Sequence, residues 1–527
     1  MTEIKRASKG LTAAALTLAT LTTGLGIALA GPARAATGHG AAKAGTVVTT
    51  TGGAVRGTAD RDGIRSFLGI PYAAPPQGAL RWASPRPAAP WAGVREATAP
   101  GPSCAQPQGL PIGTPSESED CLYLNVTTPT QRAGKRPVIV WIHGASLMFG
   151  SGDLYGPTRL AAEGAVVVTV NYRLGVMGFL ADPALNSSGG LGLEDQQAAL
   201  RWVRANAAAF GGDPANVTVM GESGGGYSVC GHLASPKSAG LFDRAIVQSA
   251  PCATGGSRTR QEAEDEAKAT ITKLVELGAC TKDEHTEACL RRTDAATLMK
   301  AYGTWNEPRP VIGTDLMPLT PAEALRTGKF NRVPVLVGVN HDEERGMILG
   351  QELAGGRPMP AEGYEPAIRA EFGSRADAVL ARYPLSRFGS AGEALATVRT
   401  DHTWSVPTLD TAKLLSQWTP TRMFEFSERD TPQWAGGKAP SFEPRAQHMA
   451  ELPYLFDFKT PLFEALTAEQ QTLAKRMTDT WVDFAETGRT DWPAFRNGGY
   501  VQSLTSGPWK RADFTADHHD TFWKSLH

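Results

Sequence analysis

One pentapeptide, Gly-Glu-Ser-Gly-Gly at residues 221–225, constrains the fold of this chain more than any other segment. It directly follows the apolar run at 217–220, which is typical of a strand, and it directly precedes a segment of helical composition. A strand, a sharp glycine-flanked turn with a serine at its tip, and a helix form a nucleophile elbow, which exposes the serine oxygen. A serine hydroxyl is a weak nucleophile unless a base activates it. The pattern therefore predicts that Ser223 is a catalytic nucleophile, provided that the chain also supplies a base.

The amino terminus has the pattern of a secretory signal peptide. A basic start with Lys5, Arg6 and Lys9 is followed by an apolar stretch at 11–30 and by the cleavage pattern Ala-Arg-Ala at 33–35. An uncleaved membrane anchor is the alternative, but the threonine and glycine content and the small residues favour cleavage. We expect residues 1–35 to be removed, 36–44 to be a flexible tail, and the exported protein to have no stable membrane insertion.

Charge and cysteine content narrow the functional classes. The net charge of the 527 residues is −1, and no basic stripe is interleaved with aromatic residues, so nucleic acid is not an expected partner. Six cysteines in an exported chain favour disulfides over metal sites, and no cysteine or histidine spacing is typical of metal ligands, so we predict no metal and no cofactor. The short loops predict Cys104 with Cys121 and Cys280 with Cys289. The remaining two cysteines either pair or stay as buried thiols: Cys230 and Cys252.

Strands alternate with helices along the chain. Continuous β-branched runs at 138–142 and 166–170 are typical of buried strands, and shorter strands are predicted at 217–220, 245–248 and 333–338. Helical composition marks residues 194–210 and a polar stretch at 261–302. This alternation predicts an α/β fold with a mostly parallel sheet covered by helices on both faces. One catalytic domain at 45–527 is expected, with large insertions around the sheet.

Several segments resemble one known family. They are Phe-Leu-Gly-Ile-Pro-Tyr-Ala at 67–73, Ser-Glu-Asp-Cys-Leu-Tyr-Leu-Asn-Val at 118–126, Asn-Tyr-Arg-Leu-Gly at 171–175, Phe-Gly-Gly-Asp-Pro at 210–214, the elbow, Gly-Val-Asn-His-Asp-Glu at 338–343 and the segment that begins with His448. The chain resembles type-B carboxylesterases of the α/β-hydrolase fold, the family that includes the cholinesterases. The resemblance covers nearly the whole mature chain.

The resemblance implies a catalytic triad of Ser223 as nucleophile, Glu343 as acid and His448 as base. This chain order is the one that α/β-hydrolases use. In such a triad the histidine takes the serine proton and later gives it to the departing alcohol, while the acid orients the imidazole. Considered from the residues alone, four neighbours or competitors remain as alternatives for the acid and the base: Asp342, Glu344, His232 and His402.

A turn at 141–146, Trp-Ile-His-Gly-Ala-Ser, matches the oxyanion-hole turn of the family. The resemblance implies that the backbone N–H groups of Ala145, Ser146 and Gly224 stabilise the developing negative charge. The chain departs from the family pattern here, because Ala145 replaces a glycine and Leu147 replaces an aromatic residue. A positive φ at Ala145 would cost about 1 kcal/mol or more, and the loss of one donor would lower turnover by about 10²–10³-fold.

Two residues near the predicted triad have open interpretations. Glu222 either tunes the site electrostatically or is a buried, hydrogen-bonded carboxylate, and Ser249 either supports the triad or ends a strand. Two further family glycines are replaced, by Glu344 after the acid and by Met449 after the base. We expect these two replacements to reshape the pocket mouth without changing the chemistry.

The loop from Cys104 to Cys121 bears on the substrate. In cholinesterases a tryptophan in this loop binds a quaternary ammonium by cation–π attraction, but here the loop contains no aromatic residue. A small uncharged carboxylic ester is therefore the predicted substrate. The alternatives are a lipase acting on long-chain acylglycerols and a non-catalytic relative that binds a partner. The oligomeric state is not predicted.

Overall fold

The computed structural model describes residues 46–526 except 60–62, 109–111, 131–134, 186, 305, 433–439, 459–462 and 497. The predicted signal peptide and tail, residues 1–44, lie outside the described residues. Among the described residues, no helix is long and apolar enough to cross a membrane.

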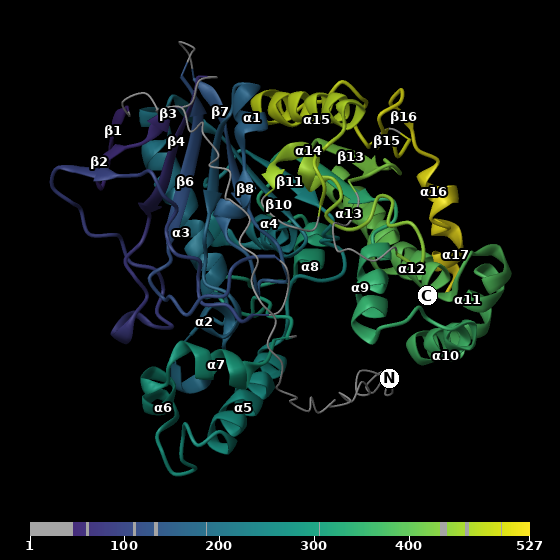
Figure 1. Ribbon diagram of the computed structural model, residues 1–527, viewed down its shortest axis with the longest axis horizontal. Helices are drawn as coiled ribbons and strands as arrows, with labels where there is room; N and C mark the ends of the chain where they lie inside the picture. The colour runs from purple at the N-terminus through teal and green to yellow at the C-terminus, as the bar shows by residue number, and fades with distance from the viewer. Residues whose placement is uncertain are drawn as a thin grey trace, which may run out of the picture. The chain divides into compact units, whose positions relative to one another are not determined.

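A twisted sheet dominates the described chain (Figure 1). Its strand order is β16-β15-β13-β12-β11-β10-β7-β9-β6-β4-β3. The pairings from β15 through β9 are parallel, and the pairings at both edges are antiparallel. The predicted mostly parallel sheet is therefore confirmed. The strands are β3 (Thr58–Ala59), β4 (Ile64–Pro71), β6 (Tyr123–Pro129), β7 (Arg136–Ile142), β9 (Val166–Val170), β10 (Gly212–Glu222), β11 (Arg244–Gln248), β12 (Val335–Asn340), β13 (Thr421–Phe426), β15 (Val501–Leu504) and β16 (Lys510–Arg511).

Helices cover both faces of this sheet. Successive side chains of a strand point to opposite faces. Along β7, Val138, Val140 and Ile142 belong to one hydrophobic core, with side chains of α3, α4 and α13. Ile139 and Trp141 belong to the other core, with side chains of α1, α14 and α15. Because both faces are buried, the central strands read as continuous apolar runs, which is why the sequence predicted them.

The predicted elements correspond to observed ones with small shifts at their ends. The helix predicted at 194–210 is α3 (Leu191–Asn206), followed by a 3₁₀ turn that ends at Gly211 with φ of 85°. The polar stretch predicted as helical at 261–302 contains three helices, the first of which begins with a capping box between Thr259 and Glu262. The helices are α1 (Thr158–Ala162), α2 (Gly175–Phe179), α3 (Leu191–Asn206), α4 (Gly224–Ala234), α5 (Arg260–Glu276), α6 (Thr286–Arg292), α7 (Ala295–Tyr302), α8 (Pro321–Thr327), α9 (Arg345–Gly355), α10 (Ala361–Phe372), α11 (Ala376–Arg382), α12 (Ala391–Arg399), α13 (Val406–Ser416), α14 (Leu452–Leu455), α15 (Ala468–Thr487), α16 (Phe514–Asp517) and α17 (Asp520–Ser525).

Smaller elements lie outside the main sheet. Two short sheets are formed by β1 (Val47–Thr50), β2 (Gly53–Arg56) and β5 (Val94–Glu96), and by β8 (Tyr155–Gly156) with β14 (Asp457–Phe458). Helices α5, α6 and α7 follow one another away from the sheet, and α9 to α12 form a second helical group (Figure 1). These groups are the insertions that the length of the chain predicted.

Three disulfides join all six cysteines. The two predicted pairs, Cys104–Cys121 and Cys280–Cys289, are present, and Cys230 pairs with Cys252. The last pair connects α4 to the loop after β11, with Cα atoms 5.4 Å apart. Closing its loop of 22 residues stabilises the fold by about 3 kcal/mol in the chain-entropy description. The helix that follows Ser223 is therefore covalently held to the neighbouring strand.

Candidate active site

Ser223 lies at the sharp turn between β10 and α4. Its φ of 52° and ψ of −123° are strained for a residue with a side chain. The turn is possible because glycines surround it: a Cβ on Gly221 would lie 2.4 Å from the carbonyl of Gly225, and one on Gly225 would lie 2.0 Å from the carbonyl oxygen of Ile142. The backbone N–H of Ser223 donates to the carbonyl of Gln248 on β11, at 3.0 Å. The strand–turn–helix predicted from the pentapeptide is thus present.

His448 and Glu343 are in direct contact, although 105 residues separate them. Nδ1 of His448 lies 2.6 Å from Oε2 of Glu343, and the backbone N–H of His448 donates to the backbone carbonyl of Glu343 at 3.0 Å. Glu343 is fully buried after β12, and its second oxygen accepts the backbone N–H of Asn340 at 2.8 Å. A carboxylate held this way orients the imidazole so that Nδ1 faces the acid and Nε2 lies on the other side of the ring.

Two buried residues that the sequence reasoning missed connect the loops of the site. The side-chain amide of Asn340 donates to the carbonyl of Gln447 at 2.8 Å and to Oε2 of Glu451 at 2.7 Å. Oε1 of Glu451 accepts a hydrogen bond from the amide of Gln248 at 2.8 Å. These bonds join the ends of β11 and β12 to the segment that carries His448. Both residues lie inside the family-like segments, which was the only signal available for them.

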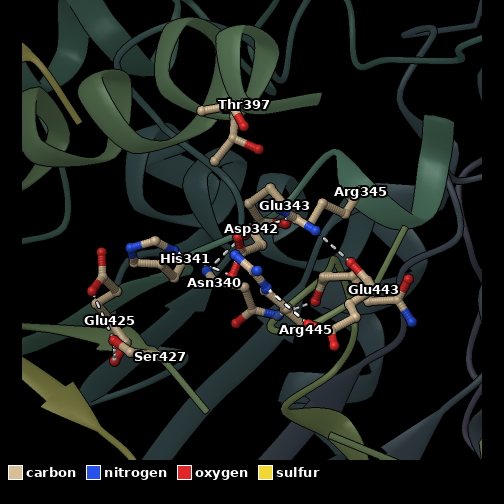
Figure 2. A network of polar contacts seen from close by, with 12 residues as sticks. Asn340, His341, Asp342, Glu343, Arg345, Thr397, Glu425, Ser427, Glu443 and Arg445 are labelled. Atoms are coloured by element: carbon tan, nitrogen blue, oxygen red, sulfur yellow. Dashed lines mark hydrogen bonds and ion pairs between the residues drawn. The ribbon is translucent and has the colours of Figure 1, made fainter. Parts of the chain in front are cut away.

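The two acidic neighbours of Glu343 have other partners. Asp342 pairs with Arg345, at 3.1 Å, and with His341, at 3.2 Å (Figure 2). Burial raises the pKa of Asp342, but His341 and Arg345 outweigh it and lower the pKa to about 2. Oε1 of Glu344 accepts the indole N–H of Trp404 at 2.8 Å. Neither carboxylate contacts His448 through a hydrogen bond among the described residues.

The two competing histidines lie elsewhere. His232 is buried on α4, with Nε2 3.0 Å from Oε1 of Gln196 and Nδ1 3.0 Å from the hydroxyl of Ser238. Burial lowers the pKa of His232 to about 3, so it stays neutral. The ring of His402 packs against Trp523. Of the three histidines considered, His448 is the one in contact with the acid that follows β12.

The predicted oxyanion-hole turn has an unusual backbone. Ala145, Ser146 and Leu147 have φ values of 61°, 57° and 59°. Left-handed conformations cost non-glycine residues about 1–3 kcal/mol each, so the surrounding structure must hold this turn in place. A Cβ on Gly224 would lie 3.1 Å from the backbone nitrogen of Ser146, which shows that the turn and the elbow are in close contact. Met449, which replaces another family glycine, also has a positive φ, of 71°.

Glu222 lies against the base. It is 1% exposed, and its Oε1 is 3.2 Å from Nε2 of His448. Burial raises the pKa of Glu222 well above its usual range, and the charges of Glu451 and Glu343 raise it further, against the effect of His448. The carboxylates around His448 in turn raise the pKa of the imidazole, outweighing burial. Glu222 and His448 therefore compete for one proton. Glu222 is thus a direct electrostatic neighbour of the predicted base.

Ser249 is not bonded to the site through its side chain. It has a φ of 46°, and its hydroxyl is buried without a hydrogen-bond partner among the described residues. Its backbone N–H donates to the carbonyl of Gly338 on β12 at 2.9 Å. The preceding residue, Gln248, contacts Ser223 through its backbone carbonyl and Glu451 through its side-chain amide.

A cluster outside this site has donors suited to a metal ion. One ligand atom each from His341, Glu425 and His518 lies within 4.8 Å of the others. Because these residues are far apart in sequence, no spacing signals them. His518 is held by Asp401 at 2.6 Å and by Glu425 at 2.7 Å. These ion pairs satisfy both ring nitrogens of His518 and connect the carboxyl-terminal helices to β13.

Comparison with known proteins relates nearly the whole described chain to one family. Residues 44–523 match the model of the carboxylesterase family. The chain is 35% identical to para-nitrobenzyl esterase of Bacillus subtilis (strain 168) over 476 residues, which cover 85% of this chain and 92% of that protein. It is 32% identical to cocaine esterase of Homo sapiens, with 92% of each chain covered. It is 34% identical to fumonisin B1 esterase of Sphingopyxis macrogoltabida, covering 87% of this chain and 86% of that protein.

Proposed function

We propose that this chain, which belongs to the carboxylesterase family and is a carboxylic ester hydrolase, cleaves small uncharged esters through an acyl-enzyme on Ser223. The observation that carries the proposal is the 2.6 Å contact between His448 and the buried Glu343, beside a nucleophile elbow. A base oriented by a carboxylate and a strained serine at a strand–helix turn are the parts that acyl transfer needs.

In the first half of the reaction, Oγ of Ser223 attacks the ester carbonyl carbon and Nε2 of His448 takes the hydroxyl proton. The tetrahedral intermediate carries a negative oxygen, which the backbone N–H groups of Ala145, Ser146 and Gly224 stabilise. The bond to the alkoxy group then breaks, and the imidazolium gives its proton to the leaving alcohol. The product is an acyl ester of Ser223 and a free alcohol.

In the second half, water attacks the acyl-enzyme and His448 again serves as base. The tetrahedral intermediate collapses, the imidazolium gives its proton to Oγ of Ser223, and the carboxylic acid leaves and ionises in solvent. The carboxylate of Glu343 stabilises the imidazolium that forms in each half. The close approach of the turn at 145–147 to Gly224 supports the placement of these donors at one oxyanion site.

The acyl preference separates this proposal from its alternative. The named substrates of the relatives differ widely in size, and a lipase acting on long-chain acylglycerols remains the second candidate. The test is hydrolysis of p-nitrophenyl esters from acetate to palmitate, with the Ser223→Ala variant as the blank. We expect a Ser223-dependent rate with its maximum at short or medium chains. A maximum at long chains would assign the lipase function, and a rate that does not depend on Ser223 would refute the acyl-enzyme.

The Glu222→Gln variant tests the electrostatics of the base. The carboxylate of Glu222 lies 3.2 Å from Nε2 of His448 and favours the imidazolium, which cannot accept the serine proton. Removing this negative charge lowers the pKa of His448. Activity is lost at low pH because the base becomes protonated, so the acidic limb follows this pKa. We therefore expect the acidic limb of the kcat/KM profile to move to lower pH in Glu222→Gln. A limb that stays in place or moves to higher pH would contradict this role.

We also propose that residues 1–35 are a signal peptide, that 36–44 are a flexible tail, and that 45–527 form one secreted catalytic domain. The basic start, the apolar stretch and the Ala-Arg-Ala pattern support this assignment. The three disulfides support an oxidising destination, since such bonds persist outside the reducing cytosol.

A further inference from the structure

The indole of Trp404 packs against the imidazole of His448. The ring centroids are 4.8 Å apart, and the ring planes are inclined by 46°. Both side chains are largely buried, with 8% of Trp404 and 10% of the His448 side chain exposed. His448 lies on an irregular segment next to Met449, whose φ is positive, so neither a helix nor a strand fixes its ring. Trp404 therefore supplies a wall that limits how the imidazole can tilt.

Trp404 is itself fixed by the residue that follows the predicted acid. Its indole N–H donates to Oε1 of Glu344 at 2.8 Å, and the backbone N–H of Glu344 donates to the hydroxyl of Thr400 at 3.0 Å. Trp404 and Thr400 both belong to one π-helical turn, Thr400–Ser405, between α12 and α13. Turns of this kind are rare and are often found at functional sites. Two bonds thus attach this turn to the loop that carries Glu343.

The position of Glu344 differs from the sequence-based expectation. It is 8% exposed and has a φ of −80°, so it does not need the left-handed conformation that a glycine would permit. Its side chain points to Trp404 and contributes to the surroundings of the base. A replacement that was expected to affect only the pocket mouth is therefore connected to His448 through one aromatic ring.

We infer that Trp404, held by Glu344, is a positioning residue that restricts the orientation of the His448 ring and favours its imidazolium form in the transition state. The face of an indole carries partial negative charge and attracts a cation more than a neutral ring. The charge on His448 exists only while the serine proton resides on it, so this attraction acts on the barrier rather than on substrate binding. This inference rests on the proposed function, since it assigns His448 as the base.

The test is steady-state kinetics of Trp404→Leu, Trp404→Phe and Glu344→Leu on one p-nitrophenyl ester. We expect Trp404→Leu to lower kcat about 10-fold with little change in KM, and Trp404→Phe to recover most of that loss because a ring face remains. The acidic limb of kcat/KM should move to lower pH by about half a unit in Trp404→Leu. Three carboxylates that act on the charge of His448 are unchanged in all of these variants: Glu222, Glu343 and Glu451. Glu344 also interacts electrostatically with His448, so the pH profile is compared between wild type and the two Trp404 variants, in which Glu344 is retained.

A double variant tests whether Glu344 acts through Trp404. If it does, Glu344→Leu should reduce kcat when Trp404 is present. The same substitution should cause no further loss when it is added to Trp404→Leu, because the two residues are coupled. Glu344→Gln should behave nearly as wild type, since an amide oxygen can still accept the indole N–H. Additive losses in the double variant would contradict the connection.

The chain contains a matched control for the loss of a buried indole. Trp523 packs against His402 with nearly the same ring distance and inclination, 4.8 Å and 45°, and His402 belongs to the π-helical turn that also carries Trp404. Trp523→Leu should lower the midpoint of thermal unfolding but leave kcat and the acidic limb in place. If Trp404→Leu affects only stability, as Trp523→Leu does, the positioning role is refuted. A wild-type rate that does not depend on Ser223 would instead refute the proposed function.

Discussion

Replacing Ser223 with alanine is expected to lower kcat by about 10⁴–10⁶-fold while the protein remains folded. The loss is large because the acyl-enzyme cannot form, and only binding and the oxyanion donors remain to act on the ester. The Ser223→Ala variant keeps the strained backbone of residue 223, with φ of 52°, so the stability of the protein should change little. The measurement is the initial rate of p-nitrophenyl ester hydrolysis, together with the circular dichroism spectrum and the midpoint of thermal unfolding.

Ser238→Ala is a suitable control for this variant. Ser238 is also buried and bonds to Gln197 and His232, away from the predicted triad. Its removal should cost about 1 kcal/mol of stability and leave kcat unchanged. Substantial hydrolysis by correctly folded Ser223→Ala would show that another residue is the nucleophile.

The second large effect is expected for Glu343→Gln, with a fall in kcat of about 10⁴-fold. The amide keeps the size of the side chain but removes the negative charge that faces Nδ1 of His448 at 2.6 Å. An amide N–H directed at Nδ1 favours the tautomer with its proton on Nε2, which cannot accept the proton of Ser223. The backbone bond between His448 and residue 343 should persist, so the loss is chemical rather than structural.

Asp342→Asn separates this effect from a general weakening of the loop. Asp342 is the neighbouring carboxylate, but it pairs with Arg345 and His341 instead of the base. The variant should lose stability because Arg345 is then left without one buried partner, yet kcat should stay within a few-fold of wild type. Equal losses of kcat in the two variants would mean that the acid assignment is wrong. The measurement is kcat at saturating ester, beside the thermal midpoint of each variant.

Most of the architecture could be predicted from local patterns. The runs at 138–142 and 166–170 predicted buried strands because a sheet covered on both faces needs apolar side chains in both directions, as β7 shows with Val140 and Trp141. The ends of helices were predicted less accurately. The sequence indicated the stop at Gly211, but the last turn before it is 3₁₀ rather than α. Local residue preferences specify an element better than its final turn, because tertiary contacts decide how the ends close.

The candidate site was partly predictable for a different reason. Ser223 was named from a glycine-flanked turn between a strand and a helix, whereas Glu343 and His448 were named from short segments that resemble those of a family. Asn340 and Glu451 lie in the same segments but were not singled out, because a polar residue in a loop gives no sign that it will be buried. The contact of Trp404 with His448 joins residues from separate parts of the chain, and no spacing in the sequence signals it.

By itself, the amino-acid sequence determined the fold class and the chemical groups available, since strand patterns, glycine-flanked turns and residue types are local properties. Only the tertiary structure decided that Cys230 and Cys252 form a disulfide, which carboxylate faces His448, and that Glu344 points toward an indole. Each of these outcomes depends on the register of β11 and β12 and on the packing of the π-helical turn against the loop after β12. Such contacts join distant segments, and their energy exists only when the whole sheet has assembled.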